Sequence, residues 1–280
     1  MIEVEHYRQW KDNSTGLMVA GAMFGAIGGA VAGAAAAAAG FIVGAMAYSG
    51  WCGIGAMSNM AGLWGTVGKI AKYGAIGIEG LHVTSTVVGA AGGLINKGWK
   101  GLGNSMKVLL GNFYLDENAS FFKSIWQGVS RHTWETIQTG LGYDYTQFRN
   151  AFGSSIDRVD YYRGATFATN ENSRDYQGVT IGSFINMDIN GKIPSGKFDD
   201  YVEKDDQMYA HEYGHTIQSR RFGLGYPIIG LLSLGSAMFD FVFNTGHSHD
   251  NFFTEVMANK YAEPIFPNYQ WGTTKYPTKY

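Results

Sequence analysis

The sequence predicts an α+β domain over residues 111–280, preceded by a Gly/Ala-rich apolar helical region over residues 1–110. Three observations lead to this prediction. No Asp, Glu, Lys or Arg occurs from Asn13 to Gly68. The composition then changes at Gly111 towards Tyr, Phe, Asp and Asn. Beyond this point, short runs of β-branched and aromatic residues between Gly and Asn turns alternate with stretches of helical spacing.

The apolar region has room for a hairpin of two helices in contact with a membrane. Residues 17–67 are uncharged, and a span of about 20 uncharged residues suffices to cross a bilayer core. A smooth face for helix packing is expected from glycines that recur every four residues, at Gly21, Gly25, Gly29 and Gly33. A core hairpin of a soluble protein and a flexible linker are the alternatives. We expect membrane contact through residues 17–67, continued by a basic amphipathic flank over residues 69–110.

Composition and charge limit the other classes of function. The 280 residues have a formal net charge of −2, and no basic patch with interleaved aromatic residues occurs, so we expect no nucleic-acid partner. Cys52 is the only cysteine, which excludes an internal disulfide and a cysteine-based zinc cluster. The first sixteen residues mix both charge signs and make a poor signal peptide. If the chain is exported, we expect delivery by a carrier system.

Periodicity and turn residues predict the first elements of residues 111–280. A helix is expected over residues 118–140, where the residues spaced for one buried face are Phe121, Phe122, Ile125, Trp126 and Val129. Residues 156–190 should form strands separated by Gly, Asn and Ser, at 159–162, 166–168 and 179–186.

The remaining elements are expected to be helical. A helix should begin near Asp205, whose side chain suits an N-cap, and end near Gly223. The apolar stretch 222–239 follows. A final helix fits residues 250–263, with Asp250 placed to cap it.

Residues 211–215 read His-Glu-Tyr-Gly-His and carry the strongest chemical signal. On a helix, His211 and His215 lie on one face, so two imidazoles can bind one metal ion. Glu212 projects beside them towards a water activated by the metal, and it can act as base and then as acid while that water attacks a carbonyl. Gly214 permits close packing against a neighbouring helix. The pattern predicts a zinc site for peptide-bond hydrolysis, and two histidines on an ordinary helix are the alternative.

A catalytic zinc site needs a third protein ligand and one open position. Arg221 stands six residues after His215, where a third histidine would fit. Glu255 is the expected ligand, and Asn259 one turn later could accept a hydrogen bond from the far nitrogen of His211. The alternatives are a solvated Glu255 and ligation by His247, His249 or Asp250.

A group that stabilises the oxyanion of a tetrahedral intermediate is also expected near the metal. The imidazole of His249 is the first candidate for this catalytic role. Tyr261 or Tyr209 could serve with a phenol. For each of the three, packing or loop structure is the alternative.

HEYGH followed by a later helical glutamate resembles the gluzincins, the thermolysin-like branch of the zincin metallopeptidases. The resemblance implies a zincin-like fold, Glu212 as general base and zinc ligands at His211, His215 and Glu255. It also implies that an edge strand upstream, here 178–186, holds an extended substrate by main-chain hydrogen bonds.

Two features depart from the gluzincin pattern. Asn259 stands where the family has an acidic residue four positions after the ligand glutamate. An apolar insertion also makes the separation of His215 from Glu255 longer than in thermolysin. The first departure concerns the residue that orients His211, and the second concerns the identity of the third ligand.

Most of residues 15–263 resembles the C-terminal toxin domains of Rhs-type polymorphic toxins, especially those of Bacteroidetes. The resemblance is carried by DRVDYYRGATF from Asp157, HEYGHTIQSRRFG from His211 and HDNFFTEVMANKYA from His249. It implies a secreted effector that acts on a protein or peptide and has a cognate immunity protein. One competing prediction is a membrane-inserting, pore-forming or translocating toxin with a secondary zinc site. Another is a site inside the membrane built on residues 222–239, which the charges flanking the metal motif oppose.

Overall fold

The computed structural model describes residues 66–152, 156–243 and 249–279. The chain divides into two compact units, residues 1–87 and residues 88–280. Of the first unit the structure describes residues 66–87, which are helical. Residues 17–65, where we expect most of the membrane contact, lie outside the described part of the chain.

Helix α3 spans Thr66–Gly111 and is interrupted at Gly98, which has φ 60° and ψ −146°. Its part after residue 88 packs within the second unit. Asn150 Nδ2 donates to the carbonyl oxygens of Gly89 and Gly101, each at 2.9 Å. Residues 88–110 thus belong to the same compact unit as the segment from residue 111 onwards.

A four-stranded sheet forms the centre of the second unit. The strands are β1 (Arg158–Tyr162), β2 (Ala165–Asn170), β3 (Asn172–Ile181) and β4 (Phe184–Asn190), in the spatial order β1-β2-β4-β3. The β2/β4 pair is parallel, and the β1/β2 and β3/β4 pairs are antiparallel. With the helices, the sheet makes the second unit a mixed helix-and-sheet structure, as the α+β prediction requires.

The prediction of one strand over residues 179–186 is wrong. Gly182 has φ 64°, a conformation that residues with a side chain rarely adopt, and it turns the chain between β3 and β4. A β-hairpin therefore replaces the single strand. β3 is an edge of the sheet, as expected for the strand beside the metal motif.

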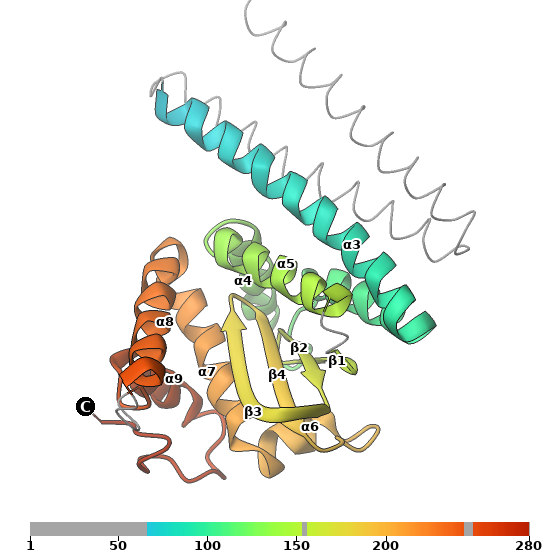
Figure 1. Ribbon diagram of the computed structural model, residues 1–280. Helices are drawn as coiled ribbons and strands as arrows, with labels where there is room; N and C mark the ends of the chain where they lie inside the picture. Colours follow the sequence, from blue (N-terminus) through green and yellow to red (C-terminus); the bar gives the residue numbers. More distant parts are fainter. Residues whose placement is uncertain (1–65, 153–155, 244–248, 280) are drawn as a thin grey trace, which may run out of the picture. The chain divides into compact units, whose positions relative to one another are not determined.

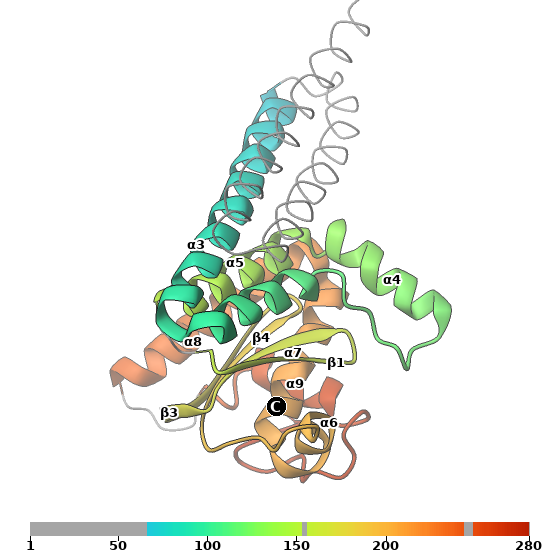
Figure 2. The same cartoon turned by 90° about the vertical axis from the view of Figure 1, so that its right-hand side faces the viewer.

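Helices cover both faces of the sheet (Figures 1 and 2). The later part of α3 and α5 (Thr136–Phe152) lie on one face, and α7 (Gln207–Phe222) and α9 (Phe253–Ala262) lie on the other. Side chains of β4 alternate between the two faces because successive residues of a strand point in opposite directions. Ile185, Met187 and Ile189 point towards α7, whereas Phe184 and Asn186 point towards α5.

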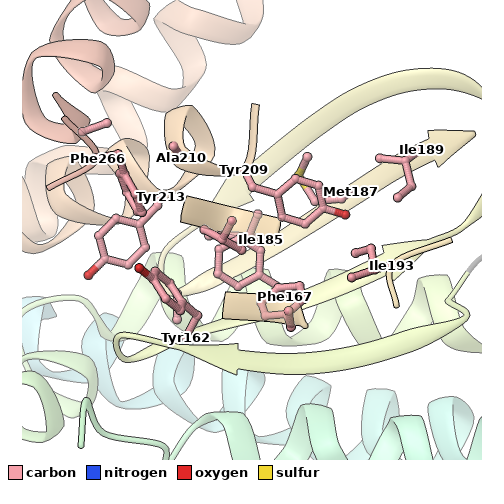
Figure 3. Packing of buried hydrophobic residues seen from close by; sticks show 14 residues of the cluster. Tyr162, Phe167, Ile185, Met187, Ile189, Ile193, Tyr209, Ala210, Tyr213 and Phe266 are labelled. Carbon is pink, nitrogen blue, oxygen red and sulfur yellow. The ribbon is translucent and has the colours of Figure 1, made fainter. Parts of the chain in front are cut away.

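The α7 face holds the apolar core (Figure 3). Phe167 of β2 stacks on Tyr209 of α7, with ring centroids 5.7 Å apart, and Phe198 packs edge-on against both rings. Phe266, beyond α9, stacks on Tyr162 of β1. These contacts join β1, β2, α7 and the segment after α9 into one core.

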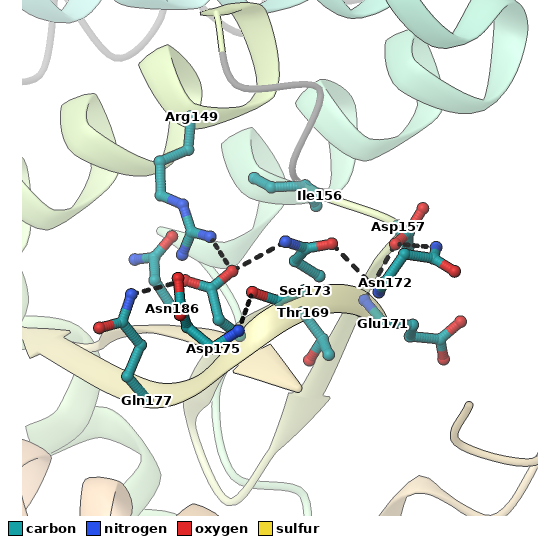
Figure 4. Close-up of polar contacts among 12 residues, drawn as sticks. Arg149, Ile156, Asp157, Thr169, Glu171, Asn172, Ser173, Asp175, Gln177 and Asn186 are labelled. Carbon is teal, nitrogen blue, oxygen red and sulfur yellow. Dashed lines mark hydrogen bonds and ion pairs between the residues drawn. The ribbon is translucent and has the colours of Figure 1, made fainter. Parts of the chain in front are cut away.

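The α5 face combines buried apolar side chains, such as Tyr143 and Phe184, with many polar ones (Figure 4). Asn186 Nδ2 donates to Thr146 Oγ1 at 2.9 Å, and Arg149 pairs with Asp188 at 2.7 Å. Gln147 Nε2 donates to the carbonyl oxygen of Ser105 at 3.1 Å, and Ser105 Oγ donates back to Gln147 Oε1 at 2.7 Å. Hydrogen bonds between α3, α5 and the sheet therefore add to the apolar packing on this face.

The predicted helix over 118–140 forms two helices, α4 (Phe121–His132) and α5. The prediction that its apolar residues are buried is wrong, because the exposed side chains of α4 include Phe121, Phe122, Ile125, Trp126 and Val129. Its buried residues are Gln127, Ser130 and Arg131. The Arg131 guanidinium donates to the carbonyl oxygens of Tyr114 and Gly164, which turns the polar side of α4 inwards.

Two predicted caps are displaced. A short helix, α6 (Phe198–Asp200), and a π-helical turn over Tyr201–Asp205 precede α7, so the N-cap of α7 is Asp206 rather than Asp205. Helix α9 begins at Phe253 with Phe252 as N-cap, so Asp250 lies in the preceding turn and does not cap the helix.

The apolar stretch after α7 forms a 3₁₀ turn (Gly223–Gly225) and helix α8 (Tyr226–Phe243). Large apolar side chains of α8 are exposed, among them Ile228, Leu231, Leu232, Met238 and Phe239. Within the described residues, one helical stretch, Gln207–Phe239, is long and apolar enough to cross a membrane by length and composition. Core helices of soluble proteins pass the same test, so this finding alone is weak evidence for a membrane span.

Candidate metal centre

Helix α7 presents the two motif histidines away from the apolar core. Its first turn is fixed by Asp206, whose side chain accepts a hydrogen bond from the backbone N–H of Met208 at 3.0 Å. Tyr209 and Tyr213 point into the core and anchor one side of the helix. His211 and His215 lie on the other side, with ring centroids 4.9 Å apart and planes at 89°. The one-turn spacing brings the two imidazoles together as expected.

Gly214 allows α9 to approach this side of α7. A Cβ at position 214 would lie 2.2 Å from the carbonyl oxygen of Ala258, far inside van der Waals contact. The expectation that this glycine permits close helix packing is confirmed. The close approach carries Glu255 of α9 to the two histidines.

Three ligand atoms converge between α7 and α9. Glu255 Oε2 lies 3.2 Å from His211 Nε2 and 3.1 Å from His215 Nε2. Zinc ligands at about 2.0–2.2 Å from a tetrahedral ion stand roughly 3.3 Å from one another. The three side chains, whose ligand atoms all lie within 4.8 Å of one another, could therefore hold a metal ion.

A fixed amide orients the ring of His211. His211 Nδ1 lies 2.7 Å from Asn259 Oδ1, and Asn259 Nδ2 donates to the carbonyl oxygen of Pro277 at 2.9 Å. Since the amide nitrogen is used by a carbonyl, the amide oxygen must face the ring and accept its Nδ1 proton. His211 Nε2 then faces Glu255. Asn259 therefore makes the expected hydrogen bond in place of a carboxylate.

His215 is oriented in the same way by a residue on its own helix. Its Nδ1 lies 2.8 Å from Gln218 Oε1, and Gln218 Nε2 donates to the carbonyl oxygen of Thr254 at 2.5 Å. The amide oxygen again accepts the Nδ1 proton, so Nε2 is directed inwards towards Glu255. Both rings therefore present Nε2 to the space beside Glu255, the nitrogen through which each could bind a metal.

The two oxygens of Glu255 have different partners. Oε1 accepts hydrogen bonds from Ser233 Oγ at 2.6 Å and Thr254 Oγ1 at 2.9 Å. Oε2 faces the two imidazoles. This division leaves one carboxylate oxygen for a metal and uses the other to fix the side chain.

The electrostatics of the three side chains favour a cation between them. Burial disfavours the charge on Glu255, but His215 and His211 outweigh it and hold the pKa of Glu255 well below its usual value. Burial likewise disfavours charge on His215, but Glu255 and then Glu212 outweigh it and raise the pKa of His215 to about 9. The carboxylates therefore make the space between the rings attractive to positive charge.

Glu212 lies between α7 and the edge strand β3. The residue is only 6% exposed, and its Oε2 accepts a hydrogen bond from Thr180 Oγ1 at 2.6 Å. A Cβ on Gly178 would lie 2.5 Å from Glu212 Oε1, so a side chain there would force the Glu212 carboxylate to move. Oε1 has no hydrogen-bond partner among the described residues. One carboxylate oxygen is thus oriented by Thr180 while the other is available to a ligand.

The other sequence candidates lie at different distances from the centre. His249 Nε2 is 3.8 Å from Glu255 Oε1, and His249 Nδ1 is buried without a hydrogen-bond partner in the described part of the chain. Asp250 lies in the same turn and does not belong to the converging group. His247 falls outside the described residues.

Neither tyrosine proposed for the oxyanion is found at the converging side chains. Tyr209 is buried in the core and shares a hydrogen bond with Thr169, with their oxygens 3.1 Å apart. The ring of Tyr261 lies under the guanidinium of Arg221, at 4.4 Å. Packing, the alternative reading, accounts for both.

Sequence reasoning missed several residues that surround the site, namely Thr180, Gln218, Ser233 and Tyr276. Gln218 had a local signal, because it follows His215 by three residues on the same helix face. The other three come from β3, α8 and the segment after α9, so only the folded chain brings them close.

Comparison with protein-family models, with curated proteins and with solved structures finds no match for this chain.

Proposed function

We propose that residues 111–280 form a zincin-like zinc metallopeptidase that hydrolyses peptide bonds. The proposal places zinc between His211, His215 and Glu255, and it gives Glu212 the role of general base and then acid. It is supported first by the ligand set, because two imidazoles and one carboxylate are a donor combination typical of catalytic zinc. Three protein ligands would leave the fourth position open to substrate and water.

The single observation that carries the proposal is the orientation of the two imidazoles. Asn259 and Gln218 each use the amide nitrogen on a backbone carbonyl and the amide oxygen on a histidine Nδ1. A pair of surface or core histidines has no need for two such matched supports. They are expected where both Nε2 lone pairs serve one cation.

Glu212 is suited to proton transfer beside such a cation. Zinc, when bound, lowers the pKa of a coordinated water to about 7. Thr180 holds one oxygen of Glu212 and leaves the other for the proton that the water loses. The same carboxylic acid can then give that proton to the leaving amine.

Strand β3 is suited to hold an extended peptide. It is an edge of the sheet, and its residues Gly178 and Thr180 lie against Glu212. A peptide added to this edge by main-chain hydrogen bonds would run past the proposed base. His249, with an unpaired buried Nδ1, lies on the Glu255 side and remains our candidate for stabilising the oxyanion.

The substitution Glu212→Gln tests the proposed chemistry. Because Glu212 is not a ligand in the proposal, the full chain should keep its zinc, while cleavage of an unstructured protein such as casein should fall by about 10²–10⁴-fold. Zinc content and cleavage are measured on the same preparation, with product ends mapped by mass spectrometry. Equal cleavage by zinc-loaded Glu212→Gln and the unmodified chain would refute the role of Glu212.

A membrane-inserting toxin is the second candidate function. The observation in its favour is the exposed apolar surface of α8. The same variant separates the two candidates, because a pore former should keep its toxicity to cells when Glu212 is replaced by Gln. Toxicity lost together with cleavage would support the peptidase.

We further propose that the peptidase is a secreted or carrier-delivered effector with a protein substrate, a cognate immunity protein and membrane contact through residues 17–67. The support for this role is the resemblance of residues 15–263 to the toxin domains of Rhs-type proteins, together with the uncharged segment near the N-terminus.

A further inference from the structure

The chain returns to the metal centre after α9. Residues 272–279, which we name the C-terminal strap, lie beside α7 and α9 (Figure 1, red). The backbone N–H of Gly272 donates to the carbonyl oxygen of Tyr276 at 2.9 Å, which closes a turn. The Tyr276 ring packs edge-on against Trp271, with centroids 6.0 Å apart. These contacts give the strap a defined conformation.

The strap is fixed on the α9 side through a residue of the metal centre. The carbonyl oxygen of Pro277 accepts the hydrogen bond from Asn259, the same side chain that orients His211. The ring of Tyr276 lies against the His211 ring, with centroids 5.9 Å apart. Burial and then the carboxylates of Asp206, Glu212 and Asp250 raise the pKa of the Tyr276 phenol. The strap thus lies beside the first histidine and near the proposed base.

On its other side the strap reaches β3. The Lys275 ammonium lies 5.4 Å from the ring centroid of Tyr176 on β3, and 5.4 Å from that of Tyr276. The Tyr176 hydroxyl in turn donates to Asp206, the N-cap of α7. The strap therefore crosses from α9 to the edge strand and passes His211 on the way.

This crossing coincides with a closed metal centre. The side chains of His211, His215 and Glu255 are 13%, 12% and 9% exposed. A catalytic metal with three protein ligands needs an open position that faces the substrate. A peptide held along β3 would have to pass the place that Lys275 and Tyr276 occupy.

We propose that the C-terminal strap is an autoinhibitory segment that occupies the substrate path along β3, with Lys275 in a subsite for a basic side chain formed by Tyr176. That the excluded ligand is a peptide rests on the proposed function. The closure of the metal centre by the strap does not depend on that function. An ammonium over an aromatic ring is a favourable contact, and Arg or Lys of a peptide would make the same one. Substrates are therefore expected to displace Lys275 and Tyr276 by offering a basic residue to Tyr176, while Pro277 keeps its hydrogen bond to Asn259.

Chemical access to His211 tests the strap without metal or substrate. The full chain, stripped of metal, is treated with diethyl pyrocarbonate, and modification of His211 is followed by peptide mass spectrometry. The variants are Tyr276→Ala and Lys275→Ala, with Lys279→Ala as the matched control on the exposed end of the strap. We expect the rate of modification at His211 to rise about tenfold in Tyr276→Ala and about threefold in Lys275→Ala, and to stay unchanged in Lys279→Ala. These increases correspond to the loss of one ring contact.

The outcomes separate failure of the strap from failure of the peptidase. If both variants are modified at His211 at the same rate as the unmodified chain, the proposed closure by the strap is overturned, whether or not the chain is a peptidase. On zinc-loaded protein, kcat/KM for a Lys-containing peptide should rise in the same two variants. A fall in kcat/KM in Tyr276→Ala at unchanged zinc content would assign Tyr276 to the reaction and would overturn autoinhibition.

Discussion

The two faces of the sheet are built from different chemistry. The face towards α7 is an aromatic and aliphatic core that includes Phe167, Ile185 and Tyr209 (Figure 3). The face towards α5 also carries many buried polar side chains, such as Asn186, which donates to Thr146, and Arg149, which pairs with Asp188 (Figure 4 shows Arg149 and Asn186). Both faces are buried, and strand β4 contributes to both through alternate residues.

The difference shows what the candidate metal centre requires. Helix α7 has one side in the apolar core and the other at the converging ligands, so the core fixes the position of His211 and His215 relative to β3. Apolar packing at close-packed density tolerates little displacement. We infer that the α7 face sets the geometry of the site, whereas the α5 face mainly holds the unit together.

Two neighbouring residues of β2 that point to opposite faces should show the largest difference in the free energy of unfolding. Phe167→Ala removes a fully buried ring from the α7 face and should lower the free energy of unfolding by about 3–5 kcal/mol. Thr166→Val on the α5 face should change it by less than about 0.5 kcal/mol, because the buried Thr166 hydroxyl has no hydrogen-bond partner among the described residues. Chemical denaturation measures both. A large loss in Thr166→Val would show that the two faces do not differ in this way.

Two glycines test whether close packing on each face serves the site equally. A Cβ at Gly214 would meet the Ala258 carbonyl oxygen at 2.2 Å, and a Cβ at Gly142 would meet the Ile181 carbonyl oxygen at 2.0 Å. Each substitution to Ala should therefore cost about 3 kcal/mol of unfolding free energy. Only Gly214→Ala should also weaken zinc binding, because it separates α7 from α9. Zinc titration of both variants decides this, and equal affinities would contradict the special role of the α7 face.

A smaller effect is expected for the polar network itself. Gln147→Met keeps the volume but leaves the Ser105 hydroxyl and carbonyl without their partner, which should cost about 1–2 kcal/mol. Zinc affinity should stay unchanged because Gln147 lies on the α5 face. Thermal unfolding and zinc titration measure the two effects, and a loss of zinc affinity would show that the network reaches the site.

The sequence was most informative where the signal is local. The HEYGH spacing, the later Glu255 and Asn259 one turn beyond it placed four side chains that the structure brings together. Gly214 was also interpreted correctly, because a helix contact needs only a small residue at one position. The α+β composition followed from the alternation of strand-like and helical runs.

Other features could not be predicted because they depend on distant residues. Apolar spacing in α4 predicted a buried face, but Arg131 finds carbonyl partners in other segments and turns the polar side inwards. Thr180 and Ser233 lie 32 and 22 residues from the carboxylates they contact. The turn at Gly182 changed one expected strand into a hairpin, since glycine alone did not indicate where the chain reverses.

The zinc content of the purified full chain tests the central claim most directly. The unmodified chain and the matched control Glu263→Ala, an exposed glutamate just after α9, should each bind close to one zinc ion per chain. Glu255→Ala removes the only carboxylate among the converging ligands and should lower zinc affinity by at least about 100-fold, so that the metal is lost on dialysis. Retention of zinc by Glu255→Ala, or absence of zinc from the unmodified chain after loading, would contradict the account.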